Sequence, residues 1–185
     1  MTFKTIVGIV LGAMLANNYA LEKFLGAAPL LGWSTQEKKI TALGSSVTIA
    51  MFFTAILAAL VQEFVLDVHS LGYLQTLVYA AIVLIVVYAM ELVAKIGGKS
   101  LGIYFPIIAL NSAVLGVAVN NAADGLSLGV SILTAWGAGM GFWLALAAFA
   151  AVRAKIRERY VPKAWRGLPI YLLTAAILSM ALLAF

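Results

Sequence analysis

Long apolar runs separated by short polar stretches dominate the chain. Six runs can be marked, and each is close to the roughly 20 residues that a helix needs to cross a bilayer. They cover about Phe3–Leu21, Ile40–Phe64, Leu71–Val93, Leu101–Val119, Leu126–Val152 and Leu168–Phe185. Apolar and polar positions do not alternate over any long stretch, which argues against the strands of a membrane barrel. The pattern predicts an all-α integral membrane protein with six transmembrane helices.

Composition supports this prediction and excludes other classes. Of the 185 residues, 64% are hydrophobic and 10% are charged, whereas a soluble domain has about 25% charged residues. The chain has no cysteine and one histidine, which excludes disulfides and thiolate-held metal and leaves no candidate catalytic residue or metal site. The basic residues lie in clusters between apolar runs, which is typical of contact with lipid headgroups and argues against nucleic acid.

The same basic residues predict the orientation in the membrane. Eleven of the 12 lie in three loops that a six-helix chain would place on one side. They are Lys23, Lys38, Lys39, Lys95, Lys99, Arg153, Lys155, Arg157, Arg159, Lys163 and Arg166. Positive loops stay cytoplasmic, so both termini are expected outside the cytoplasm, with the chain in the inner (cytoplasmic) membrane.

The two halves of the chain share a short motif. Asn18–Leu21 (NYAL) corresponds to Asn111–Val114 (NSAV), and each lies near the first apolar run of a three-run half. Because three is an odd number of crossings, the second half would be inverted relative to the first. We therefore expect a single membrane domain built from two inverted three-helix repeats, about 1–95 and 96–185, with the first helix of each repeat broken.

The first motif contains polar groups inside an apolar stretch. Asn17, Asn18 and Glu22 precede Pro29, and unpaired amides in hydrocarbon are costly. One interpretation is a broken helix that lines a cavity or an ion path. The alternative is that the first helix ends near Asn17 and an interfacial loop follows.

The second motif places Asn111 and Ser112 in the middle of the fourth run. Polar side chains at such depth face protein or water, which makes Asn111 a second candidate for a helix break or an ion path. Ser112 has the alternative of bonding back to its own helix. Asn120, Asn121 and Asp124 are expected to form an ordinary helix end with a cap.

Glycine-rich positions in two of the apolar runs predict close helix packing. Gly137, Gly139 and Gly141 lie in the fifth run, and Gly8 and Gly12 lie in the first. Small residues at these spacings let two helices approach closely in a membrane.

Three segments together resemble a known family. Asn17–Gly32 is similar to the first-span motif of the Rnf/Nqr membrane subunits, and Asn111–Ala118 is similar to their fourth-span motif. Phe149–Arg153, with Val161-Pro162 and Arg166-Gly167 further on, is similar to their last cytoplasmic loop. The resemblance covers essentially the whole chain and is greatest for the A/E-type subunit.

The resemblance implies a subunit of a complex that couples electron transfer from or to a nicotinamide to sodium or proton transport. It implies that two related six-helix subunits hold a two-iron, two-sulfur cluster between them, each with two cysteines. The cysteine positions fall on Ala28 and Ser112 in this sequence. Neither supplies a thiolate, so no cofactor is expected in this chain. Three explanations remain open: a paralogue that lost the cluster, an engineered cysteine-free variant, and a subunit repurposed for transport. The absence of every cysteine, with Ala and Ser at the two ligand positions, fits the first or the second.

The predicted function is therefore a non-catalytic, cluster-less subunit of a redox-driven ion translocase, which contributes an ion path or a scaffold. Its expected partners are a related six-helix subunit or a second copy of itself, other membrane subunits of the complex, and the lipid bilayer. A stand-alone small transporter or channel on the same repeat is the alternative, and a purely structural subunit is a third.

Overall fold

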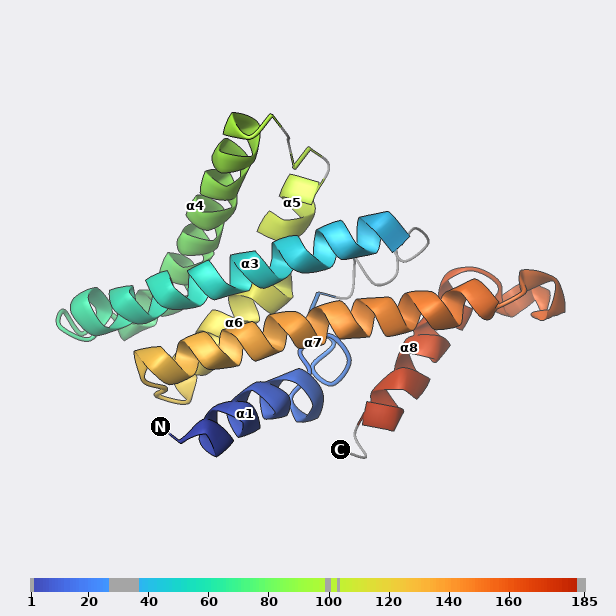
Figure 1. Cartoon of the computed structure of the whole chain (residues 1–185), viewed down its shortest axis with the longest axis horizontal. Coiled ribbons are helices and arrows are strands. Elements are labelled where there is room, and N and C mark those ends of the chain that lie inside the picture. The colour runs from blue at the N-terminus through green and yellow to red at the C-terminus, as the bar shows by residue number, and fades with distance from the viewer. Residues whose placement is uncertain (1, 27–36, 99–100, 103, 183–185) are drawn as a thin grey trace.

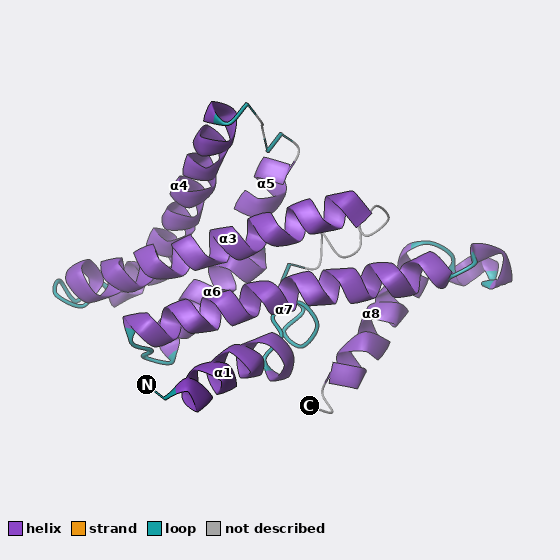
Figure 2. Cartoon of the chain, in the orientation of Figure 1, coloured by secondary structure: helices purple, strands orange, loops and turns teal. Residues whose placement is uncertain are grey.

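A computed structural model describes residues 2–26, 37–98, 101–102 and 104–182. Helices, turns and loops make up these residues, and no strand occurs among them (Figures 1 and 2). The prediction of an all-α protein is confirmed.

The helices follow the predicted apolar runs. Their bounds are α1 Phe3–Leu11, η1 Gly12–Ala16, α3 Glu37–Val61, η2 Gln62–Leu66, η3 Gly72–Leu74, α4 Gln75–Ile96, α5 Tyr104–Ala109, α6 Ser112–Ala123, α7 Leu128–Lys155, η4 Glu158–Tyr160, η5 Lys163–Trp165 and α8 Leu168–Leu182. Four helical stretches in the described residues are long and apolar enough to cross a membrane: 40–66, 72–96, 104–123 and 128–155. Phe3–Ala16 and Leu168–Ala181 are shorter apolar helices.

Two of the predicted boundaries need correction. The first helical stretch ends at Ala16, in a π-helical turn, and not at Leu21 as the hydropathy predicted. The fourth apolar run holds two helices, because α5 ends at Ala109 and α6 begins at Ser112. Both differences lie at the asparagine motifs. The break in the fourth run is confirmed, whereas in the first run the helix ends before Asn17 and residues 27–36 lie outside the described part of the chain.

An antiparallel pair of long helices, α3 and α7, forms the centre of the molecule (Figure 1). α1 packs on α7, and α6 packs on α3. α4 and α8 extend from opposite ends of the central pair toward opposite sides. The first helix of each half therefore packs on the second helix of the other half.

Close approach of α1 and α3 to α7 depends on three glycines of α7. A Cβ at Gly137 would lie 2.6 Å from the carbonyl oxygen of Val10, and one at Gly139 would lie 2.8 Å from Cα of Thr48. A Cβ at Gly141 would likewise lie 2.6 Å from the carbonyl oxygen of Met14. The predicted close packing at these positions is confirmed.

The same prediction is wrong for α1 within this chain. A Cβ at Gly8 or Gly12 would meet nothing within 4 Å. These glycines face away from the other helices, so their small size serves no contact inside the described protein.

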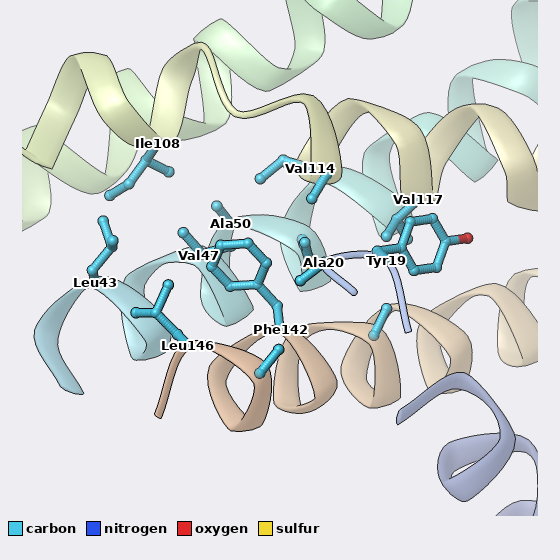
Figure 3. Packing of buried hydrophobic residues seen from close by; sticks show 14 of the residues in the cluster. Tyr19, Ala20, Leu43, Val47, Ala50, Ile108, Val114, Val117, Phe142 and Leu146 are labelled. Atoms are coloured by element: carbon cyan, nitrogen blue, oxygen red, sulfur yellow. The ribbon is translucent and has the colours of Figure 1, made fainter. Parts of the chain in front are cut away.

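Apolar side chains fill the space between the central helices and the chain after α1. Phe142 of α7 points into this space and is fully buried (Figure 3). Ala20, Val47 and Val114 surround it, from the loop after η1, α3 and α6 respectively. The break motif NYAL thus forms part of the core.

The outer faces of the helices are also apolar. Leu57, Leu84, Ile85 and Ile177 are all exposed. A row of such residues would promote aggregation in water, whereas in a bilayer it contacts lipid tails or other membrane helices.

Candidate functional site

The first helix break is organised by the side chain of Asn18, which is fully buried. Its Nδ2 donates to the carbonyl oxygens of Met14 and Gly141, each at 2.9 Å. Its Oδ1 accepts hydrogen bonds from the amides of Ala20 at 3.0 Å and Leu21 at 3.1 Å. One side chain therefore replaces the main-chain hydrogen bonds that the helix loses where it stops, and every donor of its amide is satisfied.

The second break is organised by Asn111, which lies between α5 and α6 and is 4% exposed. It caps α6, because its Oδ1 accepts a hydrogen bond from the amide of Ala113 at 2.9 Å. Its Nδ2, however, has no hydrogen-bond partner in the described part of the chain. A buried donor without a partner costs about 1–3 kcal/mol, so this amide is a candidate contact for a water or a ligand.

The two breaks touch each other. The amide of Gly26, in the turn after the first motif, donates to the Ser112 hydroxyl at 2.8 Å. Gly26 has φ +71°, and a Cβ on it would lie 2.5 Å from Oδ1 of Asn111 and 2.8 Å from Cε2 of Phe142. Only glycine fits both this backbone conformation and this space. Ser112 therefore joins the two halves, and the alternative that it only bonds back to its own helix is wrong.

Later helices hold the loop of the first break in place. Ser179 of α8 donates through its hydroxyl to the carbonyl oxygen of Leu21 at 2.5 Å. Asn120 of α6 lies within hydrogen-bonding distance of the Tyr19 hydroxyl, at 3.4 Å. The turn that begins at Asn18 is thus tied to α6, α7 and α8. Its residues Tyr19, Ala20 and Leu21 are buried, whereas Glu22, Lys23 and Phe24 are exposed.

The end of α6 does more than the predicted cap. Asp124 is the C-cap of α6, as expected. Asn121, however, is buried and donates through Nδ2 to the carbonyl oxygen of Ser131 at 3.1 Å, and Asn120 contacts Tyr19. Both asparagines therefore connect α6 to other segments.

The structure brings together three of the six predicted site residues. Asn18, Asn111 and Ser112 lie at the two breaks and the contact between them. Asn17 and Glu22 have exposed side chains next to the first break. Ala28 lies outside the described residues.

Two contributors to the first break, and a buried carboxylate elsewhere in the fold, were not found from the sequence. The carbonyl of Gly141 gives no signal in the sequence, because every residue carries a backbone carbonyl. Ser179 gives none either, because serine is common in membrane helices. Glu91 did give a signal, as a carboxylate within an apolar run. It is 8% exposed, accepts a hydrogen bond from the amide of Leu101 at 2.8 Å, and pairs with Lys95 at 3.4 Å.

The residues at the breaks do not fit an iron–sulfur cluster. Such clusters are held by thiolates, and the chain has no cysteine. Ala28 offers no donor atom, while the Ser112 hydroxyl already accepts from Gly26. No group of three or more histidines or carboxylates that could hold a metal ion occurs among the described residues.

Comparison with known proteins identifies the family. The model of the family described as Rnf-Nqr subunit, membrane protein, matches residues 6–185. The chain is 38% identical to the A-type subunit of the Na(+)-translocating ferredoxin:NAD(+) oxidoreductase complex of Acetobacterium woodii over 185 residues, which covers 98% of this chain and 96% of that protein.

Two further relatives carry the same kind of name. The A-type subunit of the ion-translocating oxidoreductase complex of Syntrophotalea carbinolica is 38% identical, with 98% of this chain and 96% of that protein covered. Its counterpart in Azoarcus sp. is 35% identical, with 96% and 94% covered. The chain therefore belongs to the Rnf-Nqr family of membrane subunits.

Proposed function

We propose that this chain is a membrane subunit of an ion-translocating Rnf/Nqr-type electron-transport complex and that it holds no cluster of its own. Its role would be to contribute an ion path or a scaffold together with related subunits. The observation that carries the proposal is the hydrogen bond from Gly26 to Ser112, which joins two buried helix breaks in a chain that matches subunits of this type over its full length.

The proposed partners are a related six-helix subunit or a second copy of this chain, other membrane subunits and lipid. The relatives are named as subunits of a complex. Apolar residues cover the outer faces of α3, α4 and α8, and such faces suit membrane helices of other subunits as well as lipid.

A stand-alone small transporter or channel is the second candidate function. The observation in its favour is the unpaired buried amide of Asn111 beside a helix break, because discontinuous helices and free polar groups form substrate and ion sites in transporters. In this case the pair Asn18 and Asn111 would lie on the path.

We also propose that residues 1–95 and 96–185 are inverted repeats. The support is the exchanged packing of α1 on α7 and α6 on α3, together with the opposite directions of α4 and α8 (Figure 1). With the basic loops cytoplasmic, both termini lie outside the cytoplasm and the chain resides in the inner membrane.

The topology is tested by single cysteines in this cysteine-free chain. Lys163→Cys should react with a membrane-impermeant maleimide only from the cytoplasmic side, and Asp67→Cys only from outside. Reaction of both positions from the same side would contradict the six-helix orientation.

The role in a complex is tested by purification in a mild detergent from the native membrane. We expect related membrane subunits to co-purify with the tagged chain, and mass spectrometry identifies them. A chain that purifies alone, and moves ions when reconstituted in liposomes, would favour the transporter.

The absence of a cluster is tested by iron analysis of the purified chain. We expect no stoichiometric iron and no charge-transfer absorption, because Ala28 and Ser112 supply no thiolate. The double variant Ala28→Cys/Ser112→Cys is the sharper test. It should acquire iron when paired with a cysteine-bearing subunit or with itself, provided that the breaks keep the family's geometry. Iron in the unmodified chain would overturn the cluster-less proposal.

A further inference from the structure

A cavity of about 650 Å³ opens at the end of the bundle where α3 ends and α7 begins. It lies between the last turns of α3 and α6 and the first turns of α4 and α7. Its inner wall is formed by three small side chains that are each 2% exposed, those of Ala55, Ala58 and Ala118. The cavity therefore reaches well into the bundle. Its volume corresponds to on the order of twenty waters at about 30 Å³ each.

The cavity is lined by polar groups although the protein is mainly apolar. The polar side chains are those of Gln62, Glu63, Asp67, Tyr79, Asn121, Ser127 and Ser131. Three of them form a chain, in which the Tyr79 hydroxyl donates to Oε1 of Gln62 at 2.7 Å and Nε2 of Gln62 donates to Oδ1 of Asp67 at 2.6 Å. Lipid tails do not fill a space lined in this way, whereas water does.

The sign of the charge in the cavity is negative. Glu63 and Asp67 contribute two carboxylates, and no lysine, arginine or histidine is among the described residues that line the space. A cleft lined by one sign of charge with apolar walls raises the local concentration of the opposite ion. No described group of three or more ligands is available to coordinate a metal, so the charge concentrates cations without a fixed coordination site.

The cavity also lies close to the first helix break. Asn121 lines it, and the preceding residue, Asn120, contacts the Tyr19 hydroxyl at 3.4 Å. Tyr19 is the neighbour of Asn18 in the chain. Neighbouring residues of α6 thus line the cavity and contact the turn of the first break.

We propose that this cavity is a water-filled vestibule, open to the non-cytoplasmic side, that concentrates small cations at the end of the bundle where α3 ends and α7 begins. The side of the membrane rests on the proposed topology.

The test uses single cysteines in the full chain in its native membrane. Ala58→Cys and Ala122→Cys line the vestibule, and Leu57→Cys is the matched control because Leu57 is exposed on the lipid-facing surface beside Ala58. Charged methanethiosulfonate reagents react with the thiolate, which forms in water and not in lipid. We expect both vestibule cysteines to react at least tenfold faster than the control, and only from the non-cytoplasmic side.

The charge is tested with a cationic and an anionic reagent of the same class. Relative to a free thiol, the cationic reagent should be favoured on the order of tenfold at the vestibule cysteines. The double variant Glu63→Gln/Asp67→Asn should remove most of this preference while leaving accessibility unchanged. Cysteines at two positions are used so that, if one variant does not fold, the reaction rates of the other still test the proposal.

Three results would overturn the proposal. They are vestibule rates no faster than Leu57→Cys, equal rates for the two reagents in the parent background, and reaction from the cytoplasmic side alone. None of these depends on co-purified subunits, so failure of the vestibule and failure of the proposed complex are distinguishable.

Discussion

The two helix breaks use the same residue in two different states. Asn18 and Asn111 both accept a hydrogen bond from the amide two residues further on, at 3.0 and 2.9 Å. Asn18 also donates two hydrogen bonds through Nδ2, whereas Nδ2 of Asn111 has no partner in the described protein. The first break is thus fully satisfied, and the second keeps an unused buried donor.

This difference has a structural cause. The chain after Asn18 turns back into the core, where α7 offers the Gly141 carbonyl oxygen at 2.9 Å. The chain after Asn111 continues directly as α6, so its asparagine serves as an ordinary helix cap. We infer that the first break mainly stabilises the fold, while Nδ2 of Asn111 at the second break is available to bind a water or an ion.

The largest effect is expected when each asparagine is replaced by leucine. Asn18→Leu removes four hydrogen bonds and leaves the buried amides of Ala20 and Leu21 without the acceptor that Asn18 provides. At about 1–3 kcal/mol for each buried group without a partner, this variant should fail to fold or lose several kcal/mol. Asn111→Leu removes one bond and should cost about 1–2 kcal/mol.

Thermal unfolding in detergent, followed by size-exclusion chromatography, compares these two variants. Equal losses of stability would contradict the difference between the breaks. If both variants express and assemble like the parent, neither asparagine is required for folding or assembly.

The next largest effect is expected at the contact between the breaks. Gly26→Ala places a Cβ 2.5 Å from Oδ1 of Asn111 at a residue with φ +71°. The left-handed backbone costs about 1–2 kcal/mol, and the overlap adds about 1–3 kcal/mol.

Gly98→Ala is the matched control for this variant. Gly98 also has φ +71°, but nothing lies within 4 Å of its Cβ position. The control should show only the backbone cost in the midpoint of thermal unfolding. Similar destabilisation of both variants would mean that close packing between the two breaks does not limit the side chain at residue 26.

A smaller effect is expected from Ser112→Ala. The Gly26 amide would lose its acceptor, at a cost of about 1–2 kcal/mol for a part-buried donor. Ser127→Ala serves as the control, because Ser127 is exposed and makes no capping hydrogen bond at the start of α7. Ser112→Thr keeps the hydroxyl and should restore part of the loss, which a role in packing alone would not predict.

The smallest effect on stability is expected from Asn111→Ser. Serine is a good N-cap and has no second donor to leave unpaired. The free energy of unfolding should therefore change by less than about 1 kcal/mol. Ion transport by the intact membrane or complex should nevertheless fall if the free amide contacts an ion or water. Unchanged ion transport in this variant would exclude a role for the Asn111 amide in the ion path.

The sequence by itself determined which stretches of the chain are apolar and that they form helices. Long runs without charge leave no alternative to helices in a bilayer, because backbone groups must be paired within the segment. The repeated motif also indicated where helices break, since a buried asparagine amide cannot be left in lipid without partners. The family motif in Asn17–Gly32 and Asn111–Ala118 was likewise readable from residues alone.

Only the tertiary structure decided what each break does. The partner of Asn18 is a backbone carbonyl 123 residues away, and backbone carbonyls carry no sequence signal. The contact of Gly26 with Ser112 spans 86 residues, and the hydropathy placed the end of the first helix at Leu21 because the buried turn is as apolar as a helix. Hydrophobicity records that a segment is buried, whereas the pairing of its polar groups depends on which distant segments pack against it.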